Sequence, residues 1–229
     1  MNVDDVEAPE ITGDRLWMIW ERQTSLMNKY HQIEFANGVG HAIVAGVDFN
    51  LDDPRWQTLI KDMFWRAVEE IGESTEAYFD HADVPIHAQE ECADALHFLV
   101  ETMILCGMKP EETLLKVGLN SWVEDAQVDL LDVLCDHGYG GLEKFFDGGI
   151  TERAYYVVEA LAMAANCLKN KPWKNTHVAT DKQRFYAHLS LALPALIGYA
   201  EAIGMDRDDV FNLYFRKSEV NKFRQRSNY

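Results

Sequence analysis

Apolar side chains recur at intervals of three and four residues along most of this chain, and that period constrains its fold more than any other feature. The period predicts a short helix after Lys109 and longer helices at about residues 14–34, 54–79, 85–107, 151–170, 181–204 and 206–226. Asp53 followed by Pro54 is typical of a helix start, and Gly107 of a helix end. No pair of segments alternates as paired strands do. The sequence therefore predicts an all-α fold, a helical bundle.

The middle of the chain breaks this pattern. Within residues 120–149 the segment DLLDVL looks helical, whereas HGYGG and DGG are typical of loops. We interpret residues 120–149 as an irregular insertion in the bundle. The chain has 229 residues, a length that one domain can fill, so we expect residues 1–229 to form a single all-α domain.

The charge balance limits the partners of the chain. It carries 21 basic and 38 acidic residues, a net charge of −17 with His neutral, which repels phosphodiester backbones and anionic lipids. We therefore expect neither nucleic acid nor a membrane surface as the main partner. No apolar run approaches the roughly 20 residues of a membrane span, and the acidic N-terminus lacks the apolar core of a secretory signal. Together with scattered cysteines, these features predict a cytoplasmic protein.

Two pairs of acidic residues carry the chemistry. Glu70 and Glu73 are three residues apart in one predicted helix, and Glu91 and Asp94 are three apart in the next. Residues at that spacing lie on the same helix face, one turn apart, so antiparallel packing of the two helices brings four carboxylates into one cleft. Carboxylates gathered in this way repel each other unless divalent cations or raised pKa values relieve them. Such oxygen ligands suit Mg²⁺, which also bridges to substrate phosphates.

Two other interpretations of these acids exist. Glutamate pairs at this spacing are common on solvated helix faces, where they have no chemical role. A di-iron centre instead needs Glu-x-x-His motifs on two helices, and none of the eight histidines follows a glutamate by three positions. Apolar neighbours such as Ala67, Ile71, Ala93 and Phe98 favour a cleft over a solvated face.

Two basic clusters interrupt the acidic chain. The C-terminal segment RKSEVNKFRQR holds five basic residues and one acid, and Lys217, Asn221 and Arg224 share one helical face. The second cluster, KNKPWKN, contains Lys171 and Lys174. Arginine binds phosphate bidentately and lysine binds it as a point charge, so both clusters suit a triphosphate. The alternative is that these cations only offset the dipoles of helix ends.

One segment of the chain echoes another. Gly107–Met108 and the residues after it align with Gly204–Met205, 97 positions later, and each pair follows a long apolar helix. At this offset the two acids of the second acidic pair are replaced by His188 and Leu191. Two related helical halves, one of which keeps an acidic site, explain the echo. Chance similarity between amphipathic helices explains it as well.

Three segments match the motifs of a known superfamily: Glu70-x-x-Glu73, ECADALHF at residues 91–98, and LYFRKSEVNKFRQRSNY at residues 213–229. Together they resemble the all-α nucleoside triphosphate pyrophosphohydrolases, which include the dimeric dUTPases, the phage dCTPase–dUTPases and MazG-like enzymes. The last segment is similar to the C-terminal motif of that superfamily, with Asn where the motif usually has Gly before its final Tyr. The matching residues are Lys217, Asn221, Arg224, Gln225 and Tyr229.

Two further segments share features with the superfamily. Lys171 and Lys174 lie in a Lys/Trp-rich segment similar to one that contacts phosphate, although here it follows the acids rather than lying between them. Gln23 and Asn28 resemble the amides that read the base, with one residue more between them than usual. The fold that the resemblance implies is a bundle of the MazG and dimeric-dUTPase type, into which residues 120–149 are inserted.

The resemblance implies a hydrolase of nucleotide metabolism, a homodimer that takes a nucleoside triphosphate as its small-molecule substrate. It implies Mg²⁺ as the cofactor and the attack of an activated water on the α-phosphorus, which releases a monophosphate and pyrophosphate. We favour dUTP as the substrate, with dCTP next. The metal ligands that the resemblance implies are Glu70, Glu73, Glu91 and Asp94, with Glu73 or Glu70 as the catalytic base.

The remaining roles follow from the same resemblance. Phosphate binding is expected of Lys217, Asn221, Arg224, Lys171 and Lys174. Contact with the nucleoside is expected of Gln23, Asn28 and Tyr229, and an aromatic platform for the base of Trp20, Trp56, Phe64 or Trp65. If the chain is encoded by a phage, the enzyme acts in the cytoplasm of the host. The alternative is a catalytically silent helical dimer that binds nucleotide or a partner protein.

Overall fold

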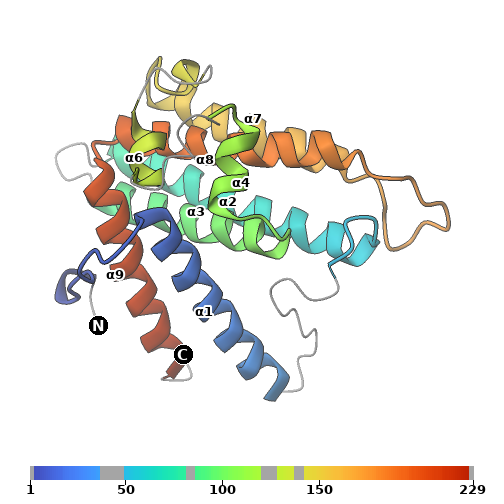
Figure 1. Cartoon of the computed structure of the whole chain (residues 1–229), viewed down its shortest axis with the longest axis horizontal. Helices are drawn as coiled ribbons and strands as arrows, with labels where there is room; N and C mark the ends of the chain where they lie inside the picture. The colour runs from blue at the N-terminus through green and yellow to red at the C-terminus, as the bar shows by residue number, and fades with distance from the viewer. Residues whose placement is uncertain (1–2, 37–48, 81–85, 120–127, 137–141, 227–229) are drawn as a thin grey trace.

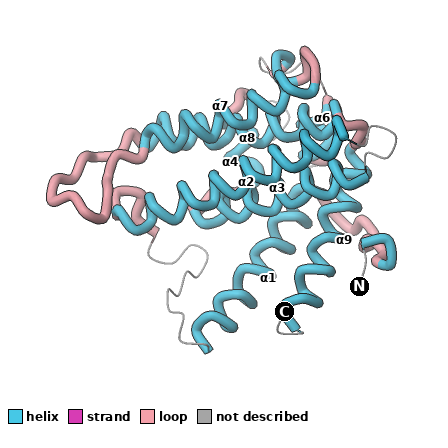
Figure 2. The backbone as a smooth tube through the Cα atoms, turned by 180° about the vertical axis from the view of Figure 1, so that it is seen from behind, coloured by secondary structure: helices cyan, strands magenta, loops and turns pink. Residues whose placement is uncertain are grey.

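The structure, a computed structural model, describes residues 3–36, 49–80, 86–119, 128–136 and 142–226 (Figure 1). No strand occurs within these ranges, and helices fill most of them (Figure 2). The longer helices are α1 (Arg15–Ala36), α2 (Pro54–Asp80), α3 (Ile86–Leu105), α7 (Ile150–Cys167), α8 (Lys182–Ala202) and α9 (Arg207–Arg226). The shorter ones are α4 (Pro110–Lys116), α6 (Leu130–Cys135) and the 3-10 helices η1 (Val3–Asp5) and η2 (Glu143–Phe145). The predicted all-α fold is confirmed.

The helices begin and end close to the residues that the sequence signals predicted. α2 starts at Pro54, as the Asp53–Pro54 signal predicted. α3 ends just before Gly107, whose φ of 72° suits glycine and lets the chain turn away from the helix. Residues 37–48 and parts of the predicted insertion, 120–127 and 137–141, lie outside the described residues. The described parts of the insertion form α6 and η2.

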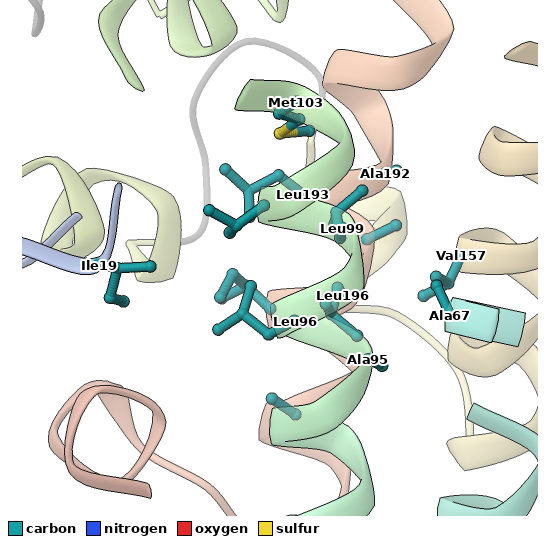
Figure 3. Close-up of a cluster of buried hydrophobic side chains, with 14 of the residues drawn as sticks. Ile19, Ala67, Ala95, Leu96, Leu99, Met103, Val157, Ala192, Leu193 and Leu196 are labelled. Atoms are coloured by element: carbon teal, nitrogen blue, oxygen red, sulfur yellow. The ribbon is translucent and has the colours of Figure 1, made fainter. Parts of the chain in front are cut away.

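α3 is the central helix of the bundle, because most of its residues are buried. Figure 3 shows Ile19 of α1 on one side of α3, with Ala67 of α2 and Val157 of α7 on the other. α8 packs against α3 as well. The side chains of α3 that lie in this core include Ala95, Leu96, Leu99 and Met103. This packing fixes the helix that carries two of the predicted metal ligands.

Two helix pairs form the main layer of the fold. α2 packs along α3, α7 packs along α8, and α2 also contacts α7. α1 and α9 lie side by side and project from this layer at a steep angle, and both contact α3 (Figures 1 and 2). No single helix among the described residues is long and apolar enough to cross a membrane. α8 and residues Arg207–Phe223 of α9 reach that length and hydropathy only as a pair, bent by 102°.

An exchange of helix caps ties the middle of the chain to the start of α1. Asp14 accepts a hydrogen bond from the first turn of α1 (2.8 Å) and another from the backbone N–H of Leu130 at the start of α6 (2.6 Å). Asp129 in turn accepts one from the first turn of α6 (2.9 Å) and one from the backbone N–H of Arg15 (2.9 Å). Each aspartate therefore satisfies otherwise unpaired N–H groups of both helix starts.

Candidate functional site

Carboxylates from α2 and α3 meet where these two helices pack. Glu70 lies on α2, and Glu91 and Asp94 lie one turn apart on α3. One carboxylate oxygen from each of the three lies within 4.8 Å of the others, and all three side chains are half-buried. The helices run antiparallel: Ser74, one turn after Glu70, donates a hydrogen bond to the carbonyl of Ala88 (2.6 Å), one turn before Glu91. We call Glu70, Glu91 and Asp94 the carboxylate cluster.

The cluster holds more negative charge than its surroundings favour. The pKa of Glu70 is raised to about 7, chiefly by burial and then by the charge of Asp94, a hydrogen bond with Glu91, and the charges of Glu91 and Glu73. Closely spaced carboxylates resist simultaneous ionisation unless an opposite charge lies nearby. A cation bound among them would relieve this repulsion.

The fourth predicted acid, Glu73, lies beside the cluster. Its side chain is exposed and lines a surface groove between α2 and α7, together with apolar and aromatic residues that include Ile71, Phe79 and Tyr155. Its charge still contributes to the raised pKa of Glu70. The structure therefore brings three of the four predicted acids together and leaves the fourth one turn away on α2.

A lysine from α9 reaches the cluster. Lys217 Nζ lies 2.5 Å from Asp94 Oδ2, and the Lys217 side chain is buried, with 10% of its surface exposed. Arg22 of α1 holds this part of α9, because its guanidinium donates hydrogen bonds to the hydroxyl of Ser218 and to the carboxylate of Glu219. A predicted phosphate-binding lysine is thus paired with a predicted metal ligand.

A buried polar network fixes α3 against α9 and α1. His97 and Tyr214 each lie one turn beyond the ion pair on their helices, and their rings stack with centroids 3.9 Å apart. Oε1 of Gln23 lies 2.9 Å from His97 Nδ1 and accepts a hydrogen bond from the Tyr214 hydroxyl (2.7 Å). Nε2 of Gln23 donates to the carboxylate of Glu101 (3.1 Å). Burial lowers the pKa of His97 to about 3, so its ring is neutral at pH 7.

The two amides predicted to read the base lie on different faces of α1. Gln23 is buried, and its amide is engaged in the network just described. Asn28 is exposed and lines a surface groove with Trp17, Trp20 and Lys29. Asn28 follows Gln23 by five positions, a rotation of about 140° around the helix. The structure does not bring them to one surface.

Of the aromatic residues considered as a platform for the base, Trp20 and Phe64 are buried in the core. Trp56 is half-buried and packs edge-on against Phe49. Trp65 is 61% exposed, and its indole N–H donates to the carboxylate one turn further along α2 (2.7 Å). Trp65 is therefore the most exposed of the four.

The second basic cluster lies away from the carboxylate cluster within the chain. Lys171 and Lys174 belong to the loop that connects α7 to α8 and projects beyond the ends of these helices (Figure 1). This loop is anchored on α2 by Lys61, whose Nζ donates to the carbonyl of Leu168 (2.6 Å). Lys61 precedes Glu70 by nine residues, about 14 Å along the helix axis.

The C-terminal motif is described only in part. Asn221 lies one turn after Lys217 on α9 and is half-buried. The side chain of Arg224 and the whole of Tyr229 lie outside the described residues.

The cluster offers a set of donors that suits a hard divalent cation. Its donors are all carboxylate oxygens, hard ligands of the type that Mg²⁺ binds, with none of the His or Cys ligands that favour softer metals. Among the described residues, these three acids form the group of potential ligands close enough to share one ion. The residues present therefore fit such an ion.

Two contacts of the site were missed from the sequence. His87 Nδ1 lies 3.2 Å from Glu91 Oε1, a pair at the i, i+4 spacing that the sequence already displays. The pairing of Lys217 with Asp94 had no such signal, because it joins helices that are far apart along the chain.

The fold and the site together indicate the class of protein to which this chain belongs. An all-helical bundle is consistent with the all-α superfamily of nucleoside triphosphate pyrophosphohydrolases. The family model described as dUTPase matches residues 80–229, well over half of the chain, and the chain belongs to this dUTPase family. Membership implies a hydrolase of the nucleotide pyrophosphatase type. The match includes Glu91, Asp94 and Lys217 and begins after Glu70. Comparison with curated proteins and with solved structures gave no further match.

Proposed function

We propose that this protein is a Mg²⁺-dependent nucleoside triphosphate pyrophosphohydrolase. It hydrolyses a deoxynucleoside triphosphate, dUTP first and dCTP next, to the monophosphate and pyrophosphate. The observation that carries this proposal is the carboxylate cluster of Glu70, Glu91 and Asp94 in a chain of the dUTPase family. Four negative charges on a triphosphate need cations at the site, and among the described residues these acids form a group that can hold them.

The acids have separate tasks in this proposal. Glu70, Glu91 and Asp94 hold Mg²⁺, which when bound lowers the pKa of a water ligand and offsets charge on the phosphates. Glu73, exposed beside the cluster, is our choice for the base that takes the proton of the attacking water. The water oxygen attacks the α-phosphorus, the bond from that phosphorus to the bridging oxygen breaks, and pyrophosphate leaves.

The C-terminal helix supplies the proposed phosphate ligands. Lys217, Asn221 and Arg224 recur along one face of α9, and Lys217 already lies beside the cluster. Tyr229 closes over the bound nucleotide. Lys171 and Lys174 lie away from the cluster of their own chain, so in this proposal they reach a triphosphate only as residues of the second copy in a homodimer.

Recognition of the base rests on α1 in this proposal. Asn28 is exposed in a groove with Trp17 and Trp20, where its amide can meet the edge of a pyrimidine. Gln23 supports that helix from its buried side, because its amide is tied to His97, Tyr214 and Glu101. Replacing Asn28 with Ala should therefore change the ratio of dUTP to dCTP turnover, whereas Gln23→Ala should lower turnover of both.

The test is a panel of deoxynucleoside triphosphates with and without Mg²⁺. Phosphate is measured before and after addition of inorganic pyrophosphatase, which separates pyrophosphate release from stepwise dephosphorylation. Glu91→Gln keeps the shape of the ligand and removes its charge. It should lower turnover at least about a hundredfold, since the loss of residues that only support metal ligands already costs 10–100-fold. Glu90→Gln, the same change one residue away and outside the cluster, is the matched control.

Two results would contradict the proposal. Near-complete activity in a folded Glu91→Gln variant would remove the metal-site assignment. Nucleotide binding without pyrophosphate release from any member of the panel would favour the alternative, a catalytically silent helical dimer that binds nucleotide or a partner protein.

A further inference from the structure

The ammonium of Lys217 lies beside the carboxylate cluster, where negative charge is concentrated. Its Nζ lies 2.5 Å from Asp94 Oδ2, and an oxygen of Asp94 lies within 4.8 Å of oxygens of Glu70 and Glu91. The free chain thus places a fixed unit charge at the edge of the carboxylate cluster. A divalent cation that binds there meets this charge as a competitor.

The contact is held by the packing of three helices. On α3 and α9 the ion pair, Asp94 with Lys217, is followed one turn away by the stacked pair of His97 and Tyr214. Tyr214 is fully buried, and its hydroxyl is bonded to α1. Arg22 binds the hydroxyl of the residue after Lys217. These contacts hold the backbone of α9 at this register, so the lysine stem enters the cluster from a fixed origin.

Two features separate this pair from an ordinary surface salt bridge. The lysine is buried with its stem in the protein, so its ammonium cannot swing freely into solvent as a surface lysine does. The acid is shared, because Asp94 belongs both to the ion pair and to the cluster. A second cation and Lys217 therefore compete for the same carboxylate.

We infer that Lys217 is the built-in counter-cation of the carboxylate cluster, paired with Asp94 in the free protein and exchanged onto a phosphate of the substrate when metal and nucleotide bind together. This inference rests on the proposed function for the identity of the incoming ligands. The exchange lets one ammonium offset part of the negative charge in both states. It also gives Lys217 opposite effects on the two ligands, because its charge opposes the metal alone and attracts the triphosphate.

The experiment measures binding rather than turnover. Mn²⁺, a paramagnetic substitute for Mg²⁺, is titrated into the full chain without nucleotide and followed by electron paramagnetic resonance. Lys217→Met keeps the apolar stem and removes the charge. It should bind Mn²⁺ about tenfold or more tightly, since a neighbouring charge within 4–6 Å shifts the balance of a carboxylate by a factor of that order. The same variant should bind the α,β-imido analogue of dUTP about tenfold more weakly.

Two variants control for helix packing and charge. Lys222→Gln removes a lysine from the same helix that pairs with Glu219 and not with the cluster, so both affinities should stay at the wild-type level. Lys217→Arg restores the charge and should return Mn²⁺ affinity toward the wild-type value. Unchanged or weaker Mn²⁺ binding in a folded Lys217→Met variant would overturn the inference.

A measurement on the wild-type chain covers the case in which Lys217→Met does not fold. Acetylation of individual lysines is followed by mass spectrometry as Mn²⁺ is added. Lys217 should become more reactive when metal takes Asp94 from it, relative to Lys222 as the internal reference, and an unchanged ratio would overturn the inference. The proposed function is tested separately. If Lys217→Met binds Mn²⁺ more tightly but the protein releases no pyrophosphate, the counter-cation role of Lys217 is supported and the proposed enzymatic activity is contradicted.

Discussion

The α2–α3 pair and the α7–α8 pair share one pattern of burial and differ in what they carry. At an offset of 90 residues, five buried positions of α2 recur as buried positions of α7: 64, 67, 71, 74 and 77 correspond to 154, 157, 161, 164 and 167. At an offset of 97, most buried positions of α3 recur in α8. Both pairs end in Gly–Met, with φ of 72° at Gly107 and 85° at Gly204. Two copies of one helical hairpin would produce this correspondence.

The acids of the carboxylate cluster are not repeated. Glu70 corresponds to Ala160, and the polar face of α3, formed by Glu91, Asp94, His97 and Glu101, corresponds to His188, Leu191, Pro194 and Gly198. In the first pair that face meets α1 and α9, which bring Gln23 and Lys217. In the second, α6 and η2 pack on α8 instead. One scaffold therefore serves as a site or as a support, depending on the few side chains along this face.

The largest effect should come from making the first pair resemble the second at its acid. Glu70→Ala places there the residue that α7 has at the corresponding position, and removes one of the three clustered oxygens. Pyrophosphate release should fall at least about a hundredfold while the far-ultraviolet dichroism stays helical. Glu159→Ala, an exposed acid of α7, is the control. Equal activities of the two variants would mean that the pairs do not differ in the way described.

The next effect tests the support role of the second pair. Gly198 lies against the backbone of η2, so the Cβ of Gly198→Ala would collide with the carbonyl oxygen of Phe145. Backbone yields less readily than a side chain, and we expect a loss of about 3 kcal/mol in the free energy of unfolding, the upper end of the usual cost of overpacking. Denaturant unfolding measures it. No loss would show that η2 is not packed on α8 in solution.

A pH effect should distinguish the pairs, because His97 has no titratable counterpart at Pro194. Burial lowers the pKa of His97 from 6.5 to about 3. The unfolded chain therefore takes up a proton below pH 6.5 that the folded chain refuses, and stability falls as pH drops from 6.5 toward 3. At pH 5 this amounts to about 2 kcal/mol relative to pH 7. Between pH 7 and pH 5, the free energy of unfolding of His97→Gln should therefore fall by about 2 kcal/mol less than that of the wild type, measured by denaturant unfolding. Equal losses would mean that His97 is exposed to water in the folded protein.

The smallest effect has the opposite sign. Gly72 lies in the interior of α2, is exposed, and has open space where a Cβ would stand. Gly72→Ala should raise the free energy of unfolding by about 0.5–1 kcal/mol, because alanine loses less backbone entropy in a helix. The same substitution thus stabilises α2 and destabilises α8. A loss of stability in Gly72→Ala would mean that something covers this face of α2.

Much of the fold followed from local patterns. The period of apolar residues, the Asp53–Pro54 start and the Gly107 end predicted the helices, because these signals act within a turn or two of the chain. The spacing of Glu91 and Asp94 likewise placed two carboxylates on one face of α3. The burial of Gln23 was not predicted, although this residue falls in the apolar stripe with Ile19 and Met27.

What escaped prediction depends on contacts between distant segments. The meeting of Lys217 with Asp94 is set by the angle at which α9 crosses α3, and no spacing in the sequence encodes that angle. The position of Lys171 and Lys174 is set by the loop after α7, which is anchored by Lys61 on a different helix. A cluster of basic residues gives the chemistry of a ligand, while the fold decides which acids it faces.

The shared caps of α1 and α6 make the irregular middle of the chain hard to trim. Excising residues 120–149 would remove α6 together with Asp129, so the backbone N–H of Arg15 would lose its acceptor, Asp14 would lose its second donor, and the start of α1 would fray. α1 would then move more freely. It carries Arg22, which donates a hydrogen bond to Ser218, the residue after Lys217. Greater mobility at the start of α1 would thus weaken the alignment of the Lys217 ammonium with the carboxylate of Asp94.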